Sequence, residues 1–216
     1  MRWFYLTLLV YVLGYFLSAF EAAFFTHFGG TAFLFALGVL PSLLSALAFA
    51  WLVKSPDPPE PFVERTSRYF ENRPLKDWLI RLALVWVAFP IAYSIFGLCV
   101  APIVVPIYRT MDFLAIPSLG TVTLLQLTRS LFMLAVLLPV FITSKASRLS
   151  LALAVGWAFY ALTGLSGMVG GDFFPTTIRW AHGVELMMDS IVYVKVATLL
   201  LAYPKSNTRD VQSLHA

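Results

Sequence analysis

The sequence predicts an all-α protein: a polytopic integral membrane helix bundle, with residues 1–216 forming one domain of six transmembrane helices. Hydrophobic residues make up 60% of the 216 positions and charged residues 12%, whereas a soluble domain is about 45–50% apolar and about 25% charged. The apolar residues gather in runs close to the roughly 20 residues that a helix needs to cross a bilayer. Because lipid offers no partner to exposed backbone groups, we expect these runs to be helical.

Charged residues, Gly or Pro bound each apolar run. They place the six spans at about 3–24, 31–53, 78–107, 121–144, 148–170 and 183–203. The first run starts like a signal peptide, but it is longer than the roughly 7–15 apolar residues of a signal core, so we expect it to be retained. The third run is long enough to tilt, or to be broken near Pro102 and Pro106.

The basic residues predict the orientation. If the N-terminus is cytoplasmic, the inner segments hold Arg2, Lys54, Arg65, Arg68, Arg73, Lys76, Arg81, Lys145, Arg148, Lys205 and Arg209. The outer segments hold only Arg109 and Arg179, which is the asymmetry of the positive-inside rule. We therefore predict a protein of the plasma (inner) membrane with both termini in the cytoplasm, a cytoplasmic loop at 54–77 and a cytoplasmic tail at 204–216.

The same distribution explains the formal net charge of +4 without a nucleic-acid partner, because the basic residues lie in short segments between apolar runs. The expected partner is the lipid bilayer, with other membrane subunits as an alternative. In the cytoplasmic loop, the Pro-rich first half should be extended. The second half, "FVERTSRYFENR", is either a short helix on an anionic leaflet or a solvated connector.

The stretch "RWAHGVELMMDS" (179–190) brings an unusual amount of charge to the last span. At about 100° per residue, one stripe of this helix holds Arg179, His182, Glu185, Asp189 and Tyr193. Lys195 lies outside the stripe, and we expect it to extend toward the cytoplasmic headgroups.

Arg129, in the fourth span, lies at a depth similar to that of Asp189, with Gln126 one turn above it. An ionised carboxylate at that depth costs about 2.5–3.5 kcal/mol on insertion scales and should have a partner. We therefore expect Arg129 to pair with Asp189, with Glu185, or with both. The result is either a polar binding site in the outer half of the bundle or a structural clasp between helices.

No metal site and no cofactor are predicted. His182 and Glu185, three residues apart, could contact one metal, but the only further outer-side donors are Asp189, Glu21 and His27. The single cysteine, Cys99, forms no disulfide within one chain and no cysteine-based metal site. The scarcity of His near the spans makes a buried haem with two His ligands a poor interpretation.

Two stretches, "QLTRSLFMLAVLLPVF" (126–141) and "FPTTIRWAHGVELMMDSIVYVKVATLLL" (174–201), resemble a group of uncharacterised bacterial integral membrane proteins. The resemblance rests on a span with Gln and Arg that ends at Leu-Pro, and on a PxxxRxxHxxE pattern at the last span. The matching positions are Gln126, Arg129, Pro139, Pro175, Arg179, His182 and Glu185. It implies a multi-pass membrane fold and no particular activity.

The functional prediction is a transporter-like protein that handles a small solute or ion at an outward-facing polar site. Two alternatives stay open. One is a structural or accessory subunit of a larger membrane complex. The other is a membrane-embedded enzyme that acts on a lipid, with His182 and Glu185 as acid and base. The sequence leans away from an enzyme.

The orientation can be tested at Ser67 in the loop. In a chain with Cys99 replaced by Ser, we expect Ser67→Cys to resist an impermeant thiol reagent in intact cells and to react once the cells are opened. Efficient labelling of intact cells would reverse the orientation and move the polar site to the inner leaflet.

Overall fold

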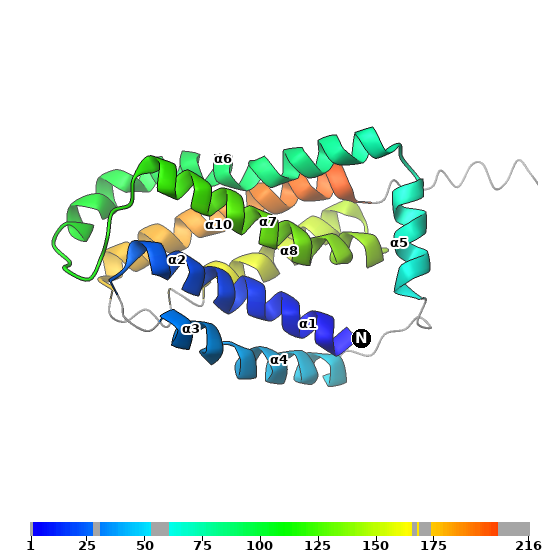
Figure 1. Cartoon of the computed structure of the whole chain (residues 1–216), viewed down its shortest axis with the longest axis horizontal. Coiled ribbons are helices and arrows are strands. Elements are labelled where there is room, and N and C mark those ends of the chain that lie inside the picture. The colour runs from blue at the N-terminus through cyan, green and yellow to red at the C-terminus, as the bar shows by residue number, and fades with distance from the viewer. Residues whose placement is uncertain (1, 28–30, 53–60, 166–167, 169–173, 203–216) are drawn as a thin grey trace, which may run out of the picture.

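The computed structural model describes residues 2–27, 31–52, 61–165, 168 and 174–202, and helices make up most of this part of the chain. The long helices lie side by side along the bundle, and one short helix crosses an end (Figure 1). The all-α prediction is confirmed. The predicted tail at 204–216 and residues 54–60 of the predicted loop lie outside the described residues.

The first two predicted spans form a helical hairpin. One arm is α1 (Arg2–Tyr11), η1 (Val12–Phe16) and α2 (Leu17–Phe25), where η1 is a π-helical segment. The returning arm is α3 (Thr31–Leu37) and α4 (Val39–Leu52), which runs beside α1 (Figure 1). Gly38 joins α3 to α4, and a Cβ there would lie only 2.3 Å from the Cβ of Tyr15. A residue without a side chain is therefore what lets the two arms approach.

The helices α5 (Phe62–Glu71) and α6 (Leu75–Tyr108) each follow a proline, which fixes φ just before the first helical residue. The helix α6 starts inside the predicted 54–77 loop, and it stays continuous through Pro102 and Pro106, so the break considered there does not occur. Pro90 has no N–H for the carbonyl of Trp86 four residues earlier. The hydroxyl of Ser130, in the next helix, donates to that carbonyl at 2.6 Å.

The last three elements follow the predicted spans with shifted bounds: α7 (Leu119–Thr143), α8 (Arg148–Tyr160) with η2 (Ala161–Leu165), and α10 (Thr176–Leu201). Ser118 and Ser147 accept hydrogen bonds from backbone N–H groups at the start of α7 and α8. The helix α10 begins before the predicted residue 183, because the polar stretch is helical rather than part of a loop. The end of the predicted fifth span, beyond Leu165, lies almost wholly outside the described residues.

The helix α5 closes one end of the bundle. The last carbonyls of a helix lack partners within it, and α5 supplies some. The Tyr69 hydroxyl donates to the Leu201 carbonyl at 2.5 Å, and Arg65 Nε donates to the Ile142 carbonyl at 3.1 Å. This segment is therefore a helix anchored to the ends of α7 and α10, and its place on an anionic leaflet stays a prediction.

Five helices of the described part are long and apolar enough to cross a membrane: Trp3–Phe25, Phe33–Leu52, Leu75–Tyr108, Leu119–Thr143 and Arg148–Leu165. The helix α10 has a comparable length of 26 residues, but its Glu185, Asp189 and Lys195 make it less apolar. Large apolar side chains are nevertheless exposed along α10, among them Val184, Ile191 and Leu199. A multi-pass membrane fold is thus consistent with the described helices.

Two glycines make a matched test of this packing. We expect Gly38→Ala to lower the free energy of unfolding by about 1–3 kcal/mol, since the new methyl group overlaps Tyr15. We expect Gly120→Ala, where only Ser118 Oγ at 3.9 Å is near, to be neutral or to stabilise by about 0.5–1 kcal/mol. Thermal unfolding in detergent measures both. Equal effects would show that α3 and α4 are not held against η1 in this way.

Candidate functional site: a buried polar cluster

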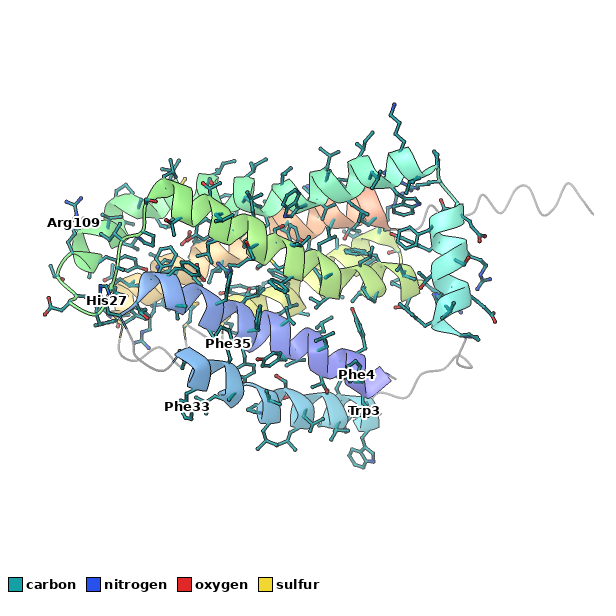
Figure 2. All side chains as sticks on the ribbon, viewed as in Figure 1. Trp3, Phe4, His27, Phe33, Phe35 and Arg109 are labelled. Carbon is teal, nitrogen blue, oxygen red and sulfur yellow. The ribbon has the colours of Figure 1, made fainter. Side chains whose placement is uncertain are left out.

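Polar side chains from four helices meet inside the half of the bundle farther from α5. We call them the polar cluster: Glu21 of α2, Tyr108 of α6, Gln126 and Arg129 of α7, and His182, Glu185 and Asp189 of α10. His27 and Arg109 mark the nearby end of the bundle, and Trp3 and Phe4 lie toward the other (Figure 2). At the His27 end, the chain near residue 26 pairs with the 109–118 connection, through Ala115 N to the Phe25 carbonyl at 2.8 Å.

Arg129 is the centre of the cluster and is only 3% exposed. Its NH1 atom lies 2.8 Å from Glu21 Oε1 and donates to Gln126 Oε1 at 3.0 Å. The guanidinium carbon also lies 5.7 Å from the centre of the Phe89 ring, a cation–π contact. The expected direct pair between Arg129 and Asp189 or Glu185 is therefore wrong, because α2 supplies the acid.

His182 and Glu185 form the second part of the cluster. His182 Nδ1 lies 2.7 Å from Glu185 Oε2, and Nε2 of the same ring is hydrogen-bonded to the Tyr108 hydroxyl. The His182 side chain is 34% exposed, whereas that of Glu185 is 2% exposed. The chain of contacts thus leads inward from a partly exposed ring to a buried carboxylate.

Gly97 of α6 provides the space for Glu185. A Cβ at Gly97 would lie 3.1 Å from Glu185 Oε1. A larger residue would push the carboxylate away from the α6 backbone. The close contact between α6 and α10 at this point is therefore part of how the site is built.

Asp189 is the third part, one turn further along α10. It is 0% exposed, and within the described residues neither of its carboxylate oxygens has a hydrogen-bond partner. Glu185, Arg129 and Glu21 act on it electrostatically. Burying a charge without a partner is costly, so Asp189 is the unusual group of the site.

Aromatic rings close the cluster on the side toward α5. Tyr193, which the helical stripe assigned to the site, is fully buried, with its ring 5.6 Å from that of Phe89 and 5.8 Å from that of Phe159. Phe89 also lies beneath the Arg129 guanidinium. Tyr193 therefore belongs to a group of packed aromatic rings on the α5 side of the charges.

Besides His182, α10 carries two basic residues, Arg179 and Lys195. Arg179 donates to the Met168 carbonyl and to the Thr176 hydroxyl, both at 3.4 Å, near the start of the helix. Lys195 is exposed, and its extension toward the headgroups stays a prediction.

Sequence reasoning identified the α7 and α10 members of the cluster and missed their partners. Glu21 carried a usable signal, because a carboxylate in an apolar span calls for a partner. Tyr108 and Gly97 carried no such signal, since an aromatic residue is common at the end of a span and a glycine is common within one. Among the described residues, no three His, Cys, Asp or Glu side chains are grouped so as to hold a metal ion.

Comparison with known protein families, curated proteins and solved structures finds no match to this chain. The resemblance to a bacterial membrane protein group stays a prediction.

The Glu21–Arg129 pair can be measured with a double-mutant cycle. We expect Glu21→Gln to cost about 3–5 kcal/mol of stability, because it leaves the Arg129 charge buried and uncompensated. Adding Arg129→Leu should recover part of that loss, whereas Arg148→Leu, at an exposed position, should change little. Thermal unfolding of the variants in detergent gives the coupling energy.

A second double-mutant cycle, between Arg129 and Asp189, gives a coupling energy to compare with that of the Glu21–Arg129 pair. We expect its coupling energy to be the smaller of the two, because Asp189 makes no direct contact with Arg129. A larger coupling with Asp189 than with Glu21 would contradict the observed pairing.

Proposed function

We propose that this chain is a six-span protein of the plasma (inner) membrane that moves a small solute or ion through the polar cluster, with both termini cytoplasmic. The helix α10 is then the sixth span. Its 26 residues give a length of about 39 Å at 1.5 Å per residue, enough to cross the hydrocarbon core. In this orientation the end with α5 faces the cytoplasm, and the polar cluster lies in the outer half of the membrane.

The observation that carries the transport proposal is the unpartnered Asp189. Ionisable groups inside membrane helices are rare, and they mark substrate and ion pathways more often than packing positions. A group that served only to hold helices together would be paired, as Glu21 and Arg129 are. Asp189 is as buried as a structural residue, but its carboxylate lacks the partner that a structural residue would have in the described chain.

The charges of the cluster support binding of a cationic species. Glu21 faces Arg129, and Glu185 faces His182, which leaves the third carboxylate without a compensating charge. A cation at Asp189 would complete the balance. The partly exposed His182 marks the side from which such a species would arrive.

A lipid-modifying enzyme is the second candidate, and the His182–Glu185 contact favours it. A ring nitrogen 2.7 Å from a carboxylate is the arrangement of a general base with the group that orients it. In that case Tyr108, on the other ring nitrogen, would occupy the position of the proton donor or acceptor toward the substrate.

Transport is tested in vesicles of phosphatidylethanolamine and phosphatidylglycerol that contain the full chain. Rapid exchange of the outer solution for amino acids, organic cations, sugars, sodium or acid should give a charge-displacement current for one of these classes. We expect Asp189→Asn to abolish the current and Asp112→Asn, at an exposed position beyond the end of α6, to leave it intact.

Two results together would overturn the proposal and favour an accessory subunit. They are the absence of a current with every probe and the detection of a stable partner subunit in the intact assembly by mass spectrometry. A change in the lipids of these vesicles that requires His182 would favour the enzyme instead.

A further inference from the structure

We infer that the ion handled at the polar cluster is a proton, that Asp189 is the group that binds it, and that Tyr108, His182 and Glu185 form its path from the outer side. This inference rests on the proposed function, since it names the ion that the proposed transporter would move. Its basis is the arrangement of three acidic groups around two basic ones.

The first step is the burial of Asp189. Its side chain is fully buried, and among the described residues no donor contacts either oxygen. A carboxylate in such a place is stabilised either by a bound cation or by conversion to the neutral acid. A proton needs only one oxygen, whereas a metal ion such as Ca²⁺ or Mg²⁺ needs about six to eight ligands. The described residues group no three candidate metal ligands, so the proton fits better.

The second step is the set of groups around Asp189. The helix α2 contributes Glu21, α7 contributes Arg129, and α10 itself contributes Glu185, all of which act on Asp189 electrostatically. The helix α6 contributes Tyr93 and Tyr108, which interact with Glu21 and Glu185. On the α8 side of α10, the Tyr160 hydroxyl donates to Met168 Sδ at 3.4 Å.

These groups balance only if Asp189 is neutral. Arg129 compensates Glu21 at 2.8 Å, and a protonated His182 compensates Glu185 at 2.7 Å. An ionised Asp189 would then leave one net negative charge in an apolar interior. Binding and release of one proton at Asp189 therefore changes the net charge of the cluster from zero to minus one, which is how a proton can be coupled to movement of a solute.

The third step is the path. The path starts from the protonated ring of His182, in which both nitrogens carry a hydrogen and Nε2 donates to the Tyr108 hydroxyl. The Nδ1–H bond then breaks as the proton passes to Glu185 Oε2 over 2.7 Å. This leaves a neutral ring with its proton on Nε2 and a neutral Glu185.

The fourth step is transfer from the Glu185 O–H to the Asp189 carboxylate, which restores the Glu185 anion and leaves Asp189 as the acid. Uptake of an external proton by the partly exposed His182 ring then restores the imidazolium and brings the net charge of the cluster to zero. Glu185 and Asp189 are four apart on one helix, so their Cβ atoms are roughly 5–6 Å apart. Below Asp189, the rings of Phe89, Tyr193 and Phe159 close the path toward α5. A proton that reaches Asp189 from outside therefore stays there until the helices rearrange.

Infrared difference spectroscopy of the full chain in detergent tests proton binding directly. Between acidic and alkaline buffer we expect a carbonyl-stretch band of a buried carboxylic acid that shifts in D₂O and is absent from Asp189→Asn. Asp112→Asn is the matched control and should keep the band. Since Asp189→Asn could fail to fold, Asp189→Glu is the second variant, and there the band should shift rather than vanish.

Vesicles with an internal pH dye and an imposed membrane potential test the path. We expect proton uptake to fall about a hundredfold in His182→Ala, at the lower end of what a positioned proton-transfer group contributes. Uptake should not change when sodium is replaced by choline. A band that persists in Asp189→Asn, or a current that requires sodium, would overturn the proton assignment.

The experiments distinguish a failure of the proton assignment from a failure of the transport proposal. A solute current that is lost in Asp189→Asn but is insensitive to pH would overturn the proton assignment and leave the transport proposal standing. The opposite result is an infrared band that depends on Asp189 in a protein whose vesicles show no current or uptake with any probe. That result would overturn the transport proposal, and with it the role of the proton as a transported ion.

Discussion

The constraint on which the rest of the structure depends is a guanidinium held inside an apolar bundle. The guanidinium is that of Arg129, and its burial obliges the fold to bring an acid to it. That acid is Glu21, which ties the N-terminal hairpin to α7 across half of the chain. The neighbouring residue, Ser130, ties α7 to α6 through the carbonyl that Pro90 leaves free. Two consecutive residues of α7 thus hold the α2 and α6 sides of the bundle together.

Once α2 has compensated Arg129, the acids of α10 have other roles. The sequence presented the charges of the last span as either a binding site or a structural clasp, and the two descriptions apply to different residues. Glu21 and Arg129 have the geometry of a clasp, paired and linked to Gln126. Asp189 has the environment expected of a functional residue, because it is buried without a hydrogen-bond partner in the described chain. Between them, Glu185 is bonded to a ring that is partly exposed.

The two ends of the bundle differ chemically. At one end, Tyr69 and Arg65 of α5 satisfy the last carbonyls of α10 and α7, which seals the helix ends with hydrogen bonds. Toward the other end lie the charged groups, with Tyr108 at the last turn of α6 and His182 in the second turn of α10. An aromatic layer that includes Phe89 and Tyr193 separates the two regions. This asymmetry places the polar cluster toward one end of the bundle and the sealed helix ends at the other.

The sequence by itself determined the helices and the inward face of α10, because hydrophobic length and the helical period are local properties. It therefore predicted His182, Glu185 and Asp189 on one face and Arg129 at a similar depth, and in the structure Arg129, Glu185 and Asp189 are buried. Tertiary structure alone decided that Glu21 pairs with Arg129, that Tyr108 reaches His182, and that Gly97 makes room for Glu185. Each of these contacts joins different helices, and which helices become neighbours depends on the packing of whole surfaces rather than on any one span. The continuity of α6 has the same cause: the acceptor that Pro90 frees is satisfied by Ser130, a residue that only packing brings near.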